Sequence, residues 1–74
     1  MYIATAYRHN GKKAAVIGCE TVEEGKEFML MRPDLLCLKM NYQTDDINKW
    51  LSESSPEYRW ENGKLEFYNW SNCE

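Results

Sequence analysis

The stretch YRWENGKLEF, residues 58–67, predicts two β-strands joined by a tight turn at Asn62-Gly63. Asn-Gly between strand-like segments is a strong hairpin signal, because both residues tolerate a positive φ. A two-residue turn also fixes the register of the two strands. The predicted opposing pairs are Tyr58 with Phe67, Arg59 with Glu66, Trp60 with Leu65, and Glu61 with Lys64. Apolar pairs fall on one face and opposite charges on the other, so both patterns agree on a single register.

A second Asn-Gly pair, Asn10-Gly11, lies between the strand-like segments 2–8 and 13–19 and predicts another hairpin. With a two-residue turn, the expected opposing pairs are Tyr7 with Ala14, Thr5 with Val16, and Ala4 with Ile17. The sequence leaves the core face of this hairpin open, because two sets of residues compete for it. One set is Ile3, Tyr7 and Val16, and the other is Tyr2, Ala4, Ala6, Ala15 and Ile17.

The segment after this hairpin predicts a helix that begins at Thr21 and ends near Arg32. Thr21 and Glu24 have the spacing of a capping box, in which each side chain accepts a hydrogen bond from the backbone N–H of the other residue. Pro33 disfavours helical geometry at the preceding residue and so ends the helix. The residues expected on its apolar face are Val22, Gly25, Phe28, Met29 and Arg32. Gly25 leaves room there for close approach to a sheet.

A strand and a short helix are predicted before the last hairpin. In residues 35–42 the side chains expected on one face are Leu36, Leu38, Met40 and Tyr42, an alternation typical of a central strand. Thr44-Asp45-Asp46 then predicts a helix N-terminus, where a hydroxyl caps the backbone and two carboxylates meet the positive end of the helix dipole. The expected apolar stripe of this helix is Ile47, Trp50 and Leu51, and Ser54-Ser55-Pro56 ends it.

The predicted elements follow one another as ββαβαββ, which indicates a two-layer α+β fold. We expect a mostly antiparallel sheet with the two helices on one face. The chain has 74 residues and no linker, so we expect one domain over residues 1–74. A domain this small needs nearly all of its large apolar residues for the core, which leaves little room for an enclosed substrate cavity.

The sequence carries no catalytic or metal-binding motif, so we expect no enzyme, no cofactor and no metal site. The single histidine, His9, lies in a turn, and Glu23 and Glu27 belong to a solvent-exposed helix face. Cys19 and Cys37 lie in apolar segments and are expected to pack in the core as small hydrophobic groups. Their spacing in the sequence does not match that of metal ligands, although folding could still place these two thiols side by side.

The expected compartment is the cytoplasm. No apolar segment approaches the ~20 residues that span a bilayer, and the N-terminal residues lack the pattern of a signal peptide. The three cysteines fit neither a disulfide framework nor a CxxC motif, so we expect reduced thiols. The third, Cys73, lies near the end of the sequence and could crosslink two chains on oxidation.

Nucleic-acid binding is the alternative function that the sequence suggests. The first hairpin carries the basic residues Arg8, Lys12 and Lys13 together with Tyr7, and exposed aromatic rings can stack on bases while cations contact phosphates. However, the net charge of the chain is −3, and residues 41–74 contain seven acidic residues against three basic ones. This acidic half would repel phosphate, so we rank nucleic-acid binding second.

Protein binding is the function we favour. If Tyr58, Trp60, Leu65 and Phe67 point inward, then Tyr68 and Trp70 lie on the other face of the sheet, where aromatic side chains are typical of interface hot spots. We expect Trp70 and Tyr68 to anchor a protein partner, with Arg59 and Glu66 in the polar rim. The alternatives are that the C-terminal tail partly covers this face or that a homodimer covers it.

In size and composition the chain is similar to the accessory proteins of bacteriophages and mobile elements, including the anti-CRISPR class. Those proteins act by binding and blocking a host protein. The resemblance implies a stoichiometric inhibitor, and it assigns no residue because no motif carries it.

Overall fold

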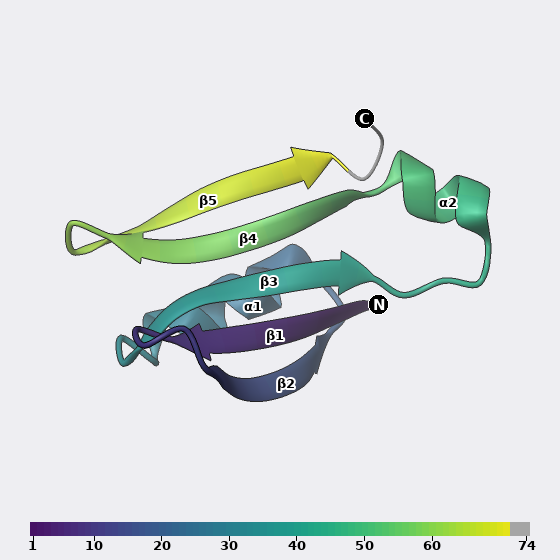
Figure 1. The fold of residues 1–74 in the computed structure, drawn as a ribbon. Coiled ribbons are helices and arrows are strands. Elements are labelled where there is room, and N and C mark those ends of the chain that lie inside the picture. Colours follow the sequence, from purple (N-terminus) through teal and green to yellow (C-terminus); the bar gives the residue numbers. More distant parts are fainter. Residues whose placement is uncertain (72–74) are drawn as a thin grey trace.

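The computed structural model describes residues 1–71 as a five-stranded antiparallel sheet with two helices (Figure 1). In chain order the elements are β1 (Tyr2–Arg8), β2 (Lys13–Cys19), α1 (Val22–Leu30), β3 (Leu35–Tyr42), α2 (Ile47–Ser52), β4 (Ser54–Glu61) and β5 (Lys64–Ser71). The strand order across the sheet is β2-β1-β3-β4-β5, which makes β3 the central strand as predicted. The predicted α+β class and the order ββαβαββ are confirmed.

One face of the sheet, here called the covered face, packs against α1, which contacts β2, β3 and β4. Its fully buried side chains include Ala4, Ala6, Leu38 and Met40. The second of the two candidate faces of the first hairpin is therefore the core face. A Cβ atom placed on Gly25 would lie 2.8 Å from the sulfur of Met40, so the absence of a side chain lets α1 approach β3 closely.

The start of α1 is capped much as the sequence predicts, with one difference. The Thr21 hydroxyl accepts a hydrogen bond from the backbone N–H of Glu24 at 3.4 Å. The Glu24 carboxylate, however, accepts from the backbone N–H of Glu20 at 2.7 Å, one residue before the predicted donor. The first bond satisfies a backbone donor in the first turn of α1 and the second satisfies one ahead of the helix, and α1 then runs to Leu30 with Met31 as its C-cap.

The hairpin of β4 and β5 has the register that its turn predicts. All four predicted pairs form: Tyr58 with Phe67, Arg59 with Glu66, Trp60 with Leu65, and Glu61 with Lys64. Asn62 and Gly63 both take a positive φ, of 52° and 78°, which is the backbone geometry of a tight two-residue hairpin turn.

The hairpin of β1 and β2 has a different turn from the predicted one. Only Gly11 takes a positive φ, of 85°, and the backbone N–H of Arg8 donates to the carbonyl of Lys12 at 2.8 Å across the loop. A register shift after Ala6 places Tyr7 opposite Lys13, so the prediction that it faces Ala14 is wrong. The other two predicted pairs form, Thr5 with Val16 and Ala4 with Ile17.

The short helix α2 lies at the end of the sheet, in the connection from β3 to β4 (Figure 1). Its N-cap is Asp46 and not Thr44, because the Asp46 carboxylate accepts from the backbone N–H groups of Asn48 and Lys49. Its apolar stripe is largely open to solvent, since Ile47 is 63% exposed and Leu51 is also exposed. A six-residue helix at the sheet end has too little neighbouring surface to bury that stripe.

The central strands β3 and β4 pair over only part of their length. In the part of the chain that the structure describes, their pairing covers Cys37 with Arg59, Leu38 with Tyr58, and Lys39 with Glu57. Beyond these pairs β3 continues along β1, and β4 continues along β5. We call this divergence between residues 40–42 and 54–56 the split. Pro56 lies in it and has no backbone N–H to donate to a neighbouring strand.

Among residues 1–71, the structure contains no helix that is both long and apolar enough to cross a membrane.

Candidate functional site

The face of the sheet opposite α1 is here called the open face. In Figure 1, α1 lies behind the sheet, and α2 lies beyond the strand ends. Register and contacts place one set of side chains on the open face: Tyr7, Lys39, Glu57, Arg59, Tyr68 and Trp70. This face combines aromatic rings with paired charges, whereas the core cluster on the covered face is made of apolar and aromatic side chains.

Trp70 and Tyr68 form a fixed aromatic pair on β5. Their rings are stacked, with centroids 5.8 Å apart and planes inclined by 11°. The Tyr68 hydroxyl donates to Glu61 Oε1 at 2.8 Å, and this hydrogen bond raises the pKa of Tyr68. The indole Nε1 of Trp70 donates to Glu57 Oε1 at 3.2 Å. Trp70 is nevertheless 55% exposed, so its ring is held in place while much of its surface stays open.

Glu57 is the buried charge that organises the open face. It is only 4% exposed, and both of its carboxylate oxygens are engaged. Oε1 accepts from Trp70, and Oε2 accepts from Arg59 Nε at 3.0 Å. The charge of Glu57 raises the pKa of Arg59 in return. A buried carboxylate needs such partners, so Glu57 couples the position of the indole to that of the guanidinium.

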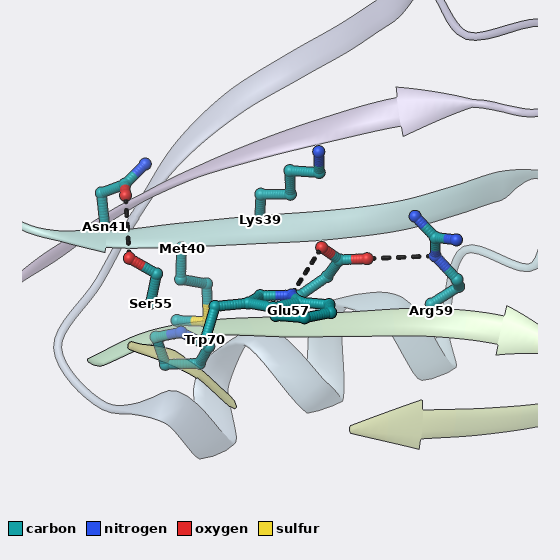
Figure 2. Close-up of a pocket in the computed structure, with 8 residues that line it drawn as sticks. Lys39, Met40, Asn41, Ser55, Glu57, Arg59 and Trp70 are labelled. Atoms are coloured by element: carbon teal, nitrogen blue, oxygen red, sulfur yellow. Dashed lines mark hydrogen bonds and ion pairs between the residues drawn. The ribbon is translucent and has the colours of Figure 1, made fainter. Parts of the chain in front are cut away.

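A pocket of about 360 Å³ lies beside Trp70, where the split opens on the open face (Figure 2). Its lining residues are Lys39, Met40, Asn41, Ser55, Pro56, Glu57, Arg59 and Trp70. The Ser55 hydroxyl donates to Asn41 Oδ1 at 3.3 Å across the split. The pocket therefore has cations toward one end, an amide and a hydroxyl at the other, and an indole ring along its wall.

The four residues predicted to contact a protein partner all fall on the open face. Trp70, Tyr68 and Arg59 are linked to one another through Glu57 and ring stacking. Glu66 lies opposite Arg59 in the strand pairing and is exposed, but Arg59 forms its ion pair with Glu57.

Phe67 departs from the sequence-based expectation that it points into the core. Its ring contacts that of Tyr58, with centroids 5.0 Å apart and planes inclined by 49°, yet Phe67 is 48% exposed. The physical reason is its place on the edge strand β5, beyond the strands that α1 contacts.

The residues of the nucleic-acid alternative lie around the first hairpin. Arg8, Lys12 and Lys13 are exposed, and Lys13 lies opposite Tyr7 in the strand pairing. Tyr7 belongs to the open face, where the ammonium of Lys39 lies 5.6 Å from the centre of its ring. These residues form a basic end of the sheet around β1 and β2, whereas Trp70 lies on β5.

The two described thiols lie on opposite faces of the sheet, and both are buried. Cys19 belongs to the core cluster, whereas Cys37 lies opposite Arg59 on the open-face side. Burial raises the pKa of both thiols, which disfavours the reactive thiolate. Among residues 1–71, no three His, Cys, Asp or Glu side chains group closely enough to hold a metal ion. Cys73 lies outside the described residues.

Sequence reasoning missed most of the residues that line the pocket, among them Lys39, Asn41 and Glu57. A partial signal was available, because Glu57 precedes Arg59 by two residues and therefore shares its face of the strand. Pro56 also indicates that strand pairing is interrupted there. The burial of Glu57 depends on Trp70 lying across it, which the sequence alone does not show.

Comparison with protein-family models finds no matching model, and comparisons with curated proteins and with solved structures find no significant match.

Proposed function

We propose that this protein is a protein-binding module whose partner docks on the open face around Trp70 and Tyr68. The observation that carries the proposal is that the Trp70 ring is largely exposed and yet held by Glu57 and Tyr68. Arg59 and Glu66 supply the polar rim of the interface.

A fixed, exposed indole suits protein recognition for a physical reason. Binding usually costs about 0.5–1.5 kcal/mol for each flexible side chain that becomes immobilised. Here the hydrogen bond to Glu57 and the stacking on Tyr68 restrict the ring before a partner arrives. Tryptophan and tyrosine are also enriched among the residues that contribute most to interface energies.

The more specific form of this proposal is a cytoplasmic, stoichiometric inhibitor. The small size and acidic composition support it, since they resemble those of phage and mobile-element proteins that block a host protein. The free, buried thiols Cys19 and Cys37 suit a reducing compartment.

The test compares Trp70→Ala with Phe67→Ala in affinity purification of the tagged protein from its native host, with and without nuclease. Both residues are aromatic, lie on β5 and are about half exposed, but they belong to opposite faces. We expect a nuclease-resistant partner that Trp70→Ala loses and Phe67→Ala retains. Circular dichroism must show that both variants stay folded.

Other outcomes contradict the proposal. A partner retained by Trp70→Ala would remove the open face from the interface. If instead only the wild-type chain dimerises in sedimentation and Trp70→Ala is monomeric, a second copy covers the face. A partner lost on nuclease treatment would favour the basic end of the sheet, and then Lys12→Glu with Lys13→Glu should abolish binding to an oligonucleotide.

A further inference from the structure

The pocket in the split has the size and position to receive part of a bound partner. Its volume of about 360 Å³ lies at the small end of the range for ligand sites, which suits a side chain better than a cofactor. It opens directly beside the indole of Trp70 (Figure 2). A chain packed on that ring would therefore place a neighbouring side chain at the pocket entrance.

The charges around the pocket favour an anionic guest. Lys39 and Arg59 contribute two positive charges, and Glu57 contributes one negative charge. Each oxygen of Glu57 already accepts a hydrogen bond, so a cationic guest would have to share these oxygens with Trp70 and Arg59. An anion finds donors that are not bonded to Glu57, because a guanidinium has N–H groups besides the Nε that Arg59 uses. The Lys39 ammonium lies 5.6 Å from the centre of the Tyr7 ring, a contact that leaves its three N–H donors without a hydrogen-bond acceptor from that ring.

The far end of the pocket offers further donors. Asn41 uses its side-chain oxygen to accept from Ser55, which leaves the amide N–H₂ group as the part of this side chain that can donate to a guest. The apolar wall formed by Met40, Pro56 and Trp70 suits the carbon atoms next to an acidic group.

We propose that this pocket binds the carboxylate of an aspartate or glutamate side chain of the protein partner, next to an apolar residue that packs on Trp70. This inference rests on the proposed function, since it names the chemistry that the open face recognises. A protein carboxylate fits better than a phosphate group, because it carries a single negative charge. A second negative charge on the bound group would be repelled by Glu57 within the pocket and by Glu61 and Glu66 on the same face.

The experiment uses two blocked dipeptides that differ only in charge, acetyl-Leu-Glu-amide and acetyl-Leu-Gln-amide. Each is titrated into the ¹⁵N-labelled full chain while the backbone amide shifts of residues 39–41 and 55–59 are followed by NMR. We expect the glutamate peptide to bind about tenfold more tightly than the glutamine peptide, as one charge-assisted contact provides.

Lys39→Met is the diagnostic variant, and Lys64→Met is its matched control. Both lysines are exposed, and each substitution removes one positive charge. Lys64, however, lies at the far end of β5 beside the turn. Lys39→Met should remove the preference for the glutamate peptide, and Lys64→Met should keep it. Amide signals away from the substituted residue that keep their wild-type positions show that each variant stays folded.

The pocket assignment would be overturned if the two peptides bound equally or if neither bound. It would also be overturned if Lys39→Met kept the preference for the glutamate peptide. The third contrary result is that inorganic phosphate produces the same shifts at a lower concentration than the glutamate peptide. The failure of the docking proposal looks different. In that case the peptides still discriminate, while Trp70→Ala retains every partner captured by the wild-type protein.

Discussion

The two faces of the sheet follow the same strand alternation but are stabilised by different physical effects. On the covered face, Ala4, Leu38 and Met40 are removed from water by α1, and apolar burial dominates. On the open face, Trp70 and Arg59 are held by hydrogen bonds to the buried carboxylate of Glu57. The difference teaches that one side of the sheet is stabilised mainly by apolar burial and the other, where we propose that a partner docks, by hydrogen bonds to a buried charge.

The largest effect is expected on the covered face. Leu38→Ala removes a fully buried side chain and leaves a cavity under α1, which costs about 2–5 kcal/mol of unfolding free energy. Val16→Ala, at a position that is 55% exposed and pairs opposite Thr5, should change it by about 0.5 kcal/mol or less. Urea denaturation followed by circular dichroism measures both. Similar losses in the two variants would contradict the division between the faces.

A smaller effect is expected where the open face depends on its buried charge. Arg59→Met leaves Oε2 of Glu57 without its guanidinium partner and should cost about 1–3 kcal/mol of unfolding free energy. In the double variant with Glu57→Gln most of this loss should be recovered, because a neutral amide can still accept from Trp70. Denaturation of the single and double variants gives their coupling energy. Additive losses would mean that the pair does not organise this face.

The sequence predicts the hairpin of β4 and β5 fully but the hairpin of β1 and β2 only in part, although both contain Asn-Gly. Asn62-Gly63 takes a positive φ at both residues, whereas only Gly11 does so in Asn10-Gly11. An Asn-Gly pair determines that the chain turns, but not which of two turn geometries it adopts. Strand β1 also pairs with β3, and its register shifts against both neighbours near the turn. That constraint comes from a strand more than twenty residues away.

The sequence predicts the part of the candidate site that follows from the register of the β4–β5 hairpin. Once the last turn is fixed, alternation alone places Tyr68 and Trp70 on the face away from Tyr58. The burial of Glu57 and the pocket were not predictable in this way. The pocket requires β3 and β4 to diverge beyond the Lys39–Glu57 pair, and the burial of Glu57 requires Trp70 of β5 to lie across it.

The smallest effect concerns the two buried thiols, one on each side of the sheet. Burial raises the pKa of Cys19 and Cys37 above their ordinary value of 9.0, so the folded protein keeps both thiols protonated at pH values where unfolded chains have begun to lose the proton. Well below pH 9 both states are protonated, and this contribution to stability is complete. As the pH rises above 9, the unfolded thiols ionise first and stability falls. The decrease in the urea midpoint between pH 8 and pH 10 should therefore become smaller in Cys19→Ala and in Cys37→Ala.

The thiols also distinguish the two faces, because the cations Arg59 and Lys39 partly offset the rise in the pKa of Cys37. Replacing Lys39 with methionine should raise that pKa further and slow the alkylation of Cys37 by iodoacetamide. The rate at Cys19 should stay the same, since the charge that acts on its pKa is that of Glu24. Mass spectrometry of a Cys73→Ser background measures the two rates separately. A parallel change at both thiols would show that Lys39→Met alters the opening of the whole fold and not the electrostatics of one face.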